Sequence, residues 1–125
     1  MNETTDPNNY KSILVIEDNF EIRESLKIAL EMEGFSVFLA ENGKIGLEKL
    51  AVIPTPCVIL LDLMMPVMNG WEFIEIISKD IMLSTIPIIV VSAFGEKNTN
   101  PKPSAYIQKP IDLDALLSAV SKHCG

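Results

Sequence analysis

The sequence predicts an α/β fold built on a doubly wound parallel sheet, and two observations carry this prediction. The first is a set of short, continuous apolar runs, which are typical of strands buried on both faces of a parallel sheet. Four of these runs lead directly into polar residues: Ser12–Ile16, Cys57–Leu61, Ile86–Val91 and Ala105–Gln108. The second is that segments with helical spacing of apolar residues alternate with the runs, as right-handed strand–helix–strand crossovers require.

The remaining elements follow from residues that start or stop helices and strands. A further strand is expected over Phe35–Ala40, and Gly34 before it should end the first helix in the C′ position. The first, second and last helices are expected to start at Asn19, Asn42 and Asp112, residues that favour N-caps, and the third helix is expected to follow Asn69-Gly70. Two glycines, Gly43 and Gly46, should weaken the second helix.

Composition narrows the class of protein. The 125 residues are enough for one domain, which we place at residues 10–125 after a flexible tail at 1–9. A net charge of −7 argues against direct binding of nucleic acid, which depends on Lys and Arg at phosphates. No signal peptide or membrane-spanning segment is found.

The two cysteines lie far apart in the sequence. Cys57 begins a predicted buried strand and Cys124 lies in the tail of the last helix, so a structural disulfide is not expected. On this ground the sequence favours a reducing, cytoplasmic location.

Polar residues gather at one edge of the predicted sheet, because the carboxyl ends of parallel strands bind ligands at that edge. Glu17, Asp18 and Asp62 would bring three carboxylates together there, with the Ser92 hydroxyl and the Lys109 ammonium. Unpaired carboxylates would repel one another, and Mg²⁺, which prefers oxygen ligands, would relieve the repulsion. A carboxylate beside Mg²⁺ can attack phosphorus and form an acyl phosphate.

Each of these residues also has an ordinary structural interpretation. Asp62 could form a turn, Glu17 and Asp18 could be a first-turn acidic pair, and Ser92 and Lys109 could be solvated surface groups. The functional interpretation rests on their joint occurrence at strand ends of one sheet.

The chain resembles the receiver domain of bacterial response regulators, the CheY-like family, from about Lys11 to His123. The segments that carry the resemblance are Val15-Ile16-Glu17-Asp18-Asn19, Leu61-Asp62-Leu63-Met64-Met65-Pro66-Val67-Met68-Asn69-Gly70, Val91-Ser92-Ala93 and Tyr106-Ile107-Gln108-Lys109-Pro110. The resemblance implies a flavodoxin-like fold with strand order 2-1-3-4-5 and a cis peptide bond between Lys109 and Pro110.

The resemblance also implies a role for each site residue. Asp62 would be the phosphoacceptor of a two-component or phosphorelay signalling switch that is not a turnover enzyme. Mg²⁺ would be held by Asp18, Asp62 and the Met64 backbone carbonyl, with Glu17 acting through water. Ser92 and Lys109 would contact the phosphoryl group, and Ser92 with Tyr106 would form the switch pair.

The phosphoryl donor implied by the resemblance is a histidine kinase or a histidine phosphotransfer protein. Its expected contact surface comprises Phe20, Arg23, Pro110 and Ile111. A downstream protein, which the sequence does not name, would read the phosphorylated state. Because no effector domain follows Gly125, the sequence is expected to be a stand-alone receiver or an excised piece of a longer protein.

The chain departs from the family between its fourth and fifth strands. Only 17 positions separate Ser92 from Lys109, fewer than receivers usually have, and the segment lacks an apolar stripe and contains Pro101 and Pro103. We therefore expect the fourth helix to be shortened or replaced by a mobile loop. The loss of its cover should expose an apolar face of the fourth and fifth strands that could support a homodimer.

Three other functions compete with the switch. A receiver-like interaction module that does not depend on phosphorylation is the main alternative, although such modules usually lose one of the residues present here. A flavodoxin-like electron carrier lacks support, because Glu17 and Asp18 would repel a flavin phosphate. An Asp-dependent phosphatase would need a second acid at position 64, which is Met.

Overall fold

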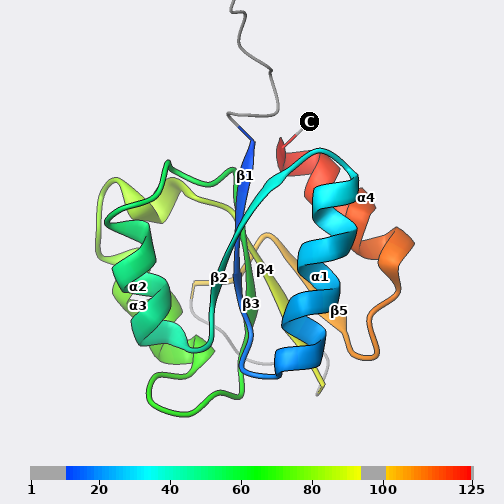
Figure 1. Ribbon diagram of the computed structural model, residues 1–125. Helices are drawn as coiled ribbons and strands as arrows, with labels where there is room; N and C mark the ends of the chain where they lie inside the picture. The colour runs from blue at the N-terminus through cyan, green and yellow to red at the C-terminus, as the bar shows by residue number, and fades with distance from the viewer. Residues whose placement is uncertain (1–10, 94–100, 125) are drawn as a thin grey trace, which may run out of the picture.

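The computed structural model describes residues 11–93 and 101–124, which form a five-stranded parallel sheet with helices on both faces (Figure 1). The strands are β1 (Ser12–Ile16), β2 (Ser36–Ala40), β3 (Val58–Asp62), β4 (Ile88–Ser92) and β5 (Ala105–Gln108). Their order is β2-β1-β3-β4-β5, and every pair is parallel. The predicted flavodoxin-like fold is therefore confirmed. The predicted tail at residues 1–9 lies outside the described part of the chain.

Within residues 11–93 and 101–124, four helices cover the two faces of the sheet. They are α1 (Phe20–Met32), α2 (Gly43–Leu50), α3 (Gly70–Ser78) and α4 (Leu113–Cys124), with a short 3₁₀ turn, η2, at Leu83–Thr85. Figure 1 shows α2 and α3 on one side of the sheet and α1 and α4 on the other. All residues of the central strands β1, β3 and β4 are buried, as the continuous apolar runs predicted.

The predicted helix starts are confirmed by side-chain caps. The Asn19, Asn42 and Asn69 side chains accept hydrogen bonds from the backbone N–H groups at the N3 positions of α1, α2 and α3. Asp112 caps α4, with its side chain accepting from Asp114 N at 3.0 Å and from Ala115 N at 3.4 Å. At the end of α1, Gly34 has a φ of 95°, the left-handed conformation that its C′ position requires.

The core consists of two apolar layers, one on each face of the sheet. Phe73, Ile74 and Ile77 of α3 pack on one face, and Leu26 and Leu30 of α1 with Leu116 and Val120 of α4 pack on the other. Alternate residues of each central strand enter opposite layers, as the period of a strand dictates. Helices pack on both faces of the sheet, so the carboxyl ends of its strands are held in place.

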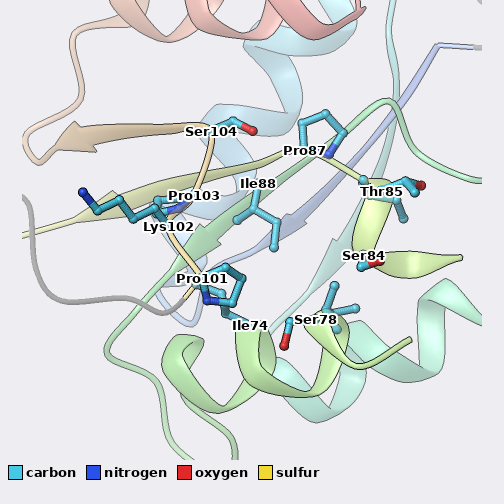
Figure 2. A pocket seen from close by; sticks show the side chains of 12 residues that line it. Ile74, Ser78, Ser84, Thr85, Pro87, Ile88, Pro101, Lys102, Pro103 and Ser104 are labelled. Carbon is cyan, nitrogen blue, oxygen red and sulfur yellow. The ribbon is translucent and has the colours of Figure 1, made fainter. Parts of the chain in front are cut away.

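Between β4 and β5, the described residues contain no helix, in agreement with the prediction of a shortened or absent fourth helix. The predicted mobility of the loop concerns mainly residues 94–100, which lie outside the described residues. A pocket of about 280 Å³ opens between α3 and the segment 101–104 that leads into β5. Figure 2 shows Ile74 and Ser78 facing Pro101 and Pro103 across this pocket.

The prediction of an exposed apolar face on β4 is wrong. Ile88 and Val90, whose side chains belong to the layer of α2 and α3, are 8% and 0% exposed. On β5, Ala105, Tyr106 and Ile107 are half-buried. A pocket lies at the start of these two strands, with Ile88 and Ser104 in its lining.

The two cysteines form a disulfide, which corrects the expectation that they stay apart. Cys57, the residue before β3, is bonded to Cys124, the last residue of α4, and their Cα atoms are 5.3 Å apart. The sequence argument failed because the doubly wound topology returns the end of the last helix to the amino ends of the strands. The cysteines therefore no longer support a reducing compartment.

Candidate functional site

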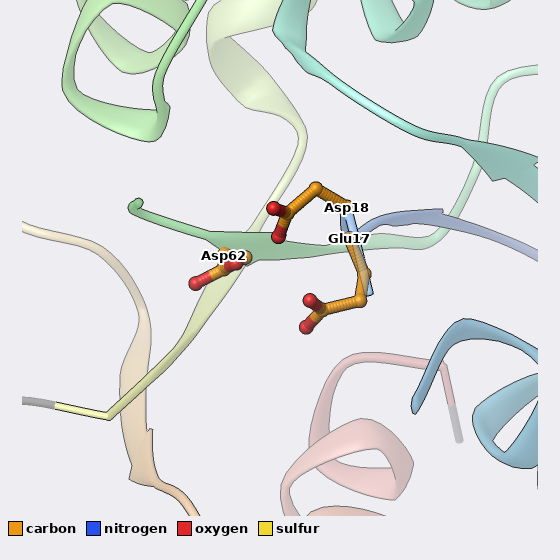
Figure 3. Close-up of side chains that lie close together, drawn as sticks. All are labelled: Glu17, Asp18 and Asp62. Atoms are coloured by element: carbon orange, nitrogen blue, oxygen red, sulfur yellow. The ribbon is translucent and has the colours of Figure 1, made fainter. Parts of the chain in front are cut away.

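Three carboxylates converge where β1 and β3 end. Glu17 and Asp18 directly follow β1, Asp62 is the last residue of β3, and the two strands are hydrogen-bonded neighbours with Ile16 opposite Leu61. One carboxylate oxygen from each acidic residue lies within 4.8 Å of the others. Figure 3 shows the three side chains gathered at this edge of the sheet. The predicted acidic cluster is therefore present.

Glu17 is buried, with only 2% of its surface exposed, and is held on several sides. Its Oε1 lies 2.9 Å from the Lys109 ammonium, and its Oε2 accepts a hydrogen bond from Asn19 N at 3.1 Å. Its backbone N–H donates to Ala40 O at the end of β2. These contacts fix the carboxylate in place. Glu17 is therefore an integral part of the site and not a solvent-exposed acidic residue in the first turn of a helix.

Asp62 is 5% exposed and lies in a strongly polarised environment. Burial of the carboxyl group, followed by the negative charge of Glu17, raises the pKa of Asp62 to about 7. Two contacts oppose this shift: Lys109 Nζ lies 3.6 Å from Oδ2, and Met64 N donates to Oδ1 at 3.4 Å. The site therefore holds more negative charge than its single lysine neutralises.

Lys109, Ser92 and Tyr106 come from the two strands on the other side of Asp62. The Lys109 side chain is 17% exposed, and its backbone N–H donates to Ser92 O at 2.8 Å, which ties the ends of β4 and β5 together. The Lys109–Pro110 peptide bond is cis, as the resemblance implied. Ser92 is 1% exposed, while Tyr106 is half-buried opposite Val90 and packs against the layer of α2 and α3.

The loop between Asp62 and α3 approaches the site closely. Met68 N donates to Pro66 O at 2.7 Å, which closes a three-residue turn around Val67, and Val67 has a φ of 69°. The loop ends at Gly70, where an added Cβ would lie 2.5 Å from Asp62 O. Gly70 therefore permits the contact between the start of α3 and the backbone of Asp62.

The donor set fits a divalent cation that prefers oxygen. Three carboxylates supply charge and ligand oxygens, and the exposed Asp18 leaves the cluster open to solvent on one side. Mg²⁺ usually binds through one or two carboxylates and keeps several waters, which this half-open cluster allows. Burial is the main cause of the raised pKa of Asp62, and a cation would offset the second cause, which is repulsion by Glu17.

The four residues of the expected partner surface differ in their environments. Phe20 is 64% exposed, Pro110 is exposed and Ile111 is half-buried. A groove of about 400 Å³ runs between α1 and the segment 109–113, and Pro110 and Ile111 contribute to its lining. Arg23 is different, because its guanidinium contacts the backbone of Glu17 and Asp18. The sequence did not indicate that contact.

The family model of the response regulator receiver domain matches residues 13–121, and the chain belongs to this family. It is 37% identical over 117 residues to the transcriptional regulatory protein CrdR of Helicobacter pylori, covering 90% of this chain and 54% of CrdR. It is 32% identical over 114 residues to protein PilH of Pseudomonas aeruginosa, covering 87% of this chain and 93% of PilH. The chain thus spans about half the length of CrdR but nearly all of PilH.

Solved structures agree with the family. A sensor protein from Polaromonas sp. JS666 superposes with a TM-score of 0.84 at 28% identity, covering 91% of this chain and 95% of that one. The chemotaxis protein CheY4 of Vibrio cholerae gives 0.79 at 23% identity, with coverage of 90% and 98%, and shows the shared fold. Membership in the family supports a phosphorylation-based signalling role for the chain. In the described residues, no helix is long and apolar enough to cross a membrane.

Proposed function

We propose that the chain is a phosphorylation-dependent switch of a two-component or phosphorelay system, with Asp62 as its phosphoacceptor. The observation that carries the proposal is the buried Asp62 carboxylate at the end of β3, which lies among Glu17, Asp18 and the Lys109 ammonium. The cluster combines a nucleophilic oxygen, an excess of negative charge suited to a cation, and a fixed ammonium. These are the groups that phosphoryl transfer to a carboxylate needs.

Each residue of the site has a separate role in phosphoryl transfer. A carboxylate oxygen of Asp62 attacks the phosphorus of a phosphohistidine, so a P–O bond forms while the P–N bond breaks and the imidazole leaves with the bonding pair, taking up a proton. Asp18, Asp62 and the Met64 carbonyl would hold Mg²⁺, with Glu17 acting through water. When bound, Mg²⁺ neutralises charge on the transferring group. Lys109 and Ser92 contact phosphoryl oxygens.

The switch is carried by Ser92 and Tyr106. When the Ser92 hydroxyl moves to contact the phosphoryl group, the half-buried Tyr106 ring gains room toward the end of β4 and turns inward. The pocket between α3 and the segment 101–104 lies on this side of the sheet. We place contact with the downstream protein, or with a second copy of the chain, at this pocket and β5. The domain assists its own phosphorylation and dephosphorylation but is not a turnover enzyme.

The phosphoryl donor is a histidine kinase or a histidine phosphotransfer protein of the cytoplasm. Its contact surface comprises Phe20, Pro110 and Ile111. Pro110 and Ile111 line the groove beside α1, and Phe20 is exposed at the start of α1. Phe20→Ala should slow transfer from the phosphohistidine protein and leave labelling by acetyl phosphate unchanged. Equal slowing of both reactions would instead indicate a defect in the site.

The experiment that tests the function is labelling by acetyl phosphate with Mg²⁺, followed by intact mass. The wild-type chain should gain one phosphoryl group, and Asp62→Asn should gain none while keeping its fold. A receiver-like module that does not depend on phosphorylation would bind its partner equally well with and without labelling. Labelling of Asp62→Asn at the wild-type rate would show that the phosphoacceptor is another residue.

A further inference from the structure

Arg23 contacts the backbone that carries the acidic pair. Its Nη1 donates to the carbonyl oxygen of Glu17 at 2.7 Å and lies 3.3 Å from that of Asp18. Its Cζ lies 5.6 Å from the centre of the Phe20 ring, within the range of a cation–π contact. Arg23 belongs to α1, but its guanidinium is hydrogen-bonded to the loop between β1 and α1.

The hydrogen bonds from Arg23 give the Glu17 and Asp18 carbonyl oxygens a donor where the chain leaves β1. Beyond Ile16 the chain leaves β1, and the hydrogen bond of Arg23 is part-buried at the Glu17 carbonyl and exposed at the Asp18 carbonyl. A buried or half-buried carbonyl without a partner is costly, and a hydrogen bond from a charged donor is stronger than one from a neutral donor. One guanidinium reaches both carbonyls, so it fixes two successive peptide groups at once.

Fixing these peptide groups sets the starting point of both acidic side chains. Glu17 is also restrained by Lys109, Asn19 and Ala40. Asp18 is exposed, and its side chain shares a hydrogen bond with Asp62, which needs a proton between the two carboxyl groups. A cation bound by both groups would displace that proton, so the direction of the Asp18 side chain would then depend on its backbone, which Arg23 holds.

We infer that Arg23 is a positioning residue that sets the affinity of the Glu17–Asp18–Asp62 cluster for a divalent cation. This inference deepens the proposed function and rests on it. It also replaces the sequence-based role of Arg23 as a partner contact, because a guanidinium held by two carbonyls and an aromatic ring is not available to a partner without giving up those bonds. Residues that orient metal ligands typically contribute 10-fold to 100-fold to affinity.

The test compares three variants of the full chain by calorimetric titration with Mg²⁺. Arg23→Met keeps the aliphatic stem but donates no hydrogen bond, and we expect it to weaken Mg²⁺ binding about 10-fold. Arg23→Lys keeps a cation that can reach one carbonyl and should recover part of the loss. Lys27→Met is the matched control, since Lys27 lies one turn further along α1 and pairs with Glu31 at 3.4 Å, away from the cluster. It should bind Mg²⁺ like the wild type.

Labelling by acetyl phosphate gives a second readout. The Mg²⁺ concentration for half-maximal labelling should rise in Arg23→Met by the factor seen in the titration, while the rate at saturating Mg²⁺ stays close to wild type. If Arg23→Met binds Mg²⁺ as tightly as Lys27→Met, the inference is overturned. It is also overturned if Arg23→Met slows transfer only from a phosphohistidine protein, since Arg23 would then be a partner contact. Failure of the wild type to become labelled would count against the proposed function, and the Mg²⁺ titration would still decide the role of Arg23.

Discussion

The Lys109 ammonium lies 2.9 Å from Glu17 and 3.6 Å from Asp62, so it is closer to the acidic residue after β1 than to the proposed phosphoacceptor. Both carboxylates are almost fully buried, and Lys109 is the cation paired with them in the described residues. One lysine therefore bridges the ends of β1, β3 and β5. It has a structural role in addition to its expected contact with the phosphoryl group.

Lys109→Met should destabilise the domain by roughly 3 kcal/mol at pH 8, because removing one partner of a buried ion pair leaves uncompensated charge. The loss should be smaller at pH 5, where a carboxyl group of the cluster takes up a proton. Denaturant unfolding at the two pH values measures both effects. Lys27→Met, which breaks an exposed pair on α1, should cost less than about 0.5 kcal/mol at either pH. Equal losses in the two variants would contradict this role of Lys109.

The raised pKa of Asp62 predicts how stability depends on pH when Mg²⁺ is removed by a chelator. Between about pH 4 and pH 7, the folded chain keeps a proton on Asp62 that the unfolded chain has lost, so the free energy of unfolding falls as the pH rises through this window. The fall contributed by Asp62 can reach roughly 4 kcal/mol for a shift of this size. Denaturant unfolding from pH 4 to pH 8 should show it.

Asp62→Asn should flatten this profile, since the amide does not titrate. Asp114→Asn, at an exposed carboxyl in the first turn of α4, is the control and should retain the wild-type profile. Added Mg²⁺ should stabilise the wild type more at pH 8 than at pH 5, because the cation competes with the proton. A wild-type profile that stays flat without Mg²⁺ would refute the assignment of the proton to Asp62.

Val67 has an unfavourable backbone conformation that glycine would relieve. It is a β-branched residue with a φ of 69°, and it is exposed, so the substitution removes little packing. Val67→Gly should therefore stabilise the domain by about 1 kcal/mol in denaturant unfolding. Val52→Gly, at an exposed valine whose φ is not positive, should instead destabilise by about 0.5–1 kcal/mol. The same sign of change at both positions would rule out strain at Val67.

The Cys57–Cys124 disulfide should contribute measurably to stability. It spans 67 residues, and the chain-entropy model gives about 4 kcal/mol for a loop of that length. Reduction with dithiothreitol should lower the melting temperature by roughly 10 °C or more. A Cys124→Ser variant should melt at the lower temperature with or without the reductant. Identical melting of the oxidised and reduced wild type would show that the bond does not stabilise the fold.

Local patterns explain what could be predicted from the sequence. An apolar run or an Asn or Asp cap determines the structure of only the few residues around it. The positions of β1, β5 and the starts of the four described helices could therefore be predicted. Since the strands are parallel, their polar ends had to meet at one edge, and the Glu17–Asp18–Asp62 cluster followed from the topology.

Features that depend on the packing of distant segments could not be predicted. Gly46 looked like a weakness of α2, yet an added Cβ there would lie 2.5 Å from Ile16, so the glycine allows α2 to approach the sheet. The pairing of Cys57 with Cys124 depends on where α4 ends in space. The contact of Arg23 with two carbonyls depends on the path of the loop after β1, and nothing in the spacing of residues encodes that path.

The covalent bond between α4 and the residue before β3 limits how the domain can respond to a change at Asp62. Figure 1 shows the end of α4 close to the amino ends of the strands, opposite the edge that carries the acidic cluster. The bond holds that end of α4 to the residue before β3. Its first turn, which follows Lys109, Pro110 and Ile111, lies at the other end of the helix. We therefore expect any shift of α4 on phosphorylation to be smallest at Cys124 and largest in the first turn, and reduction of the bond should enlarge it.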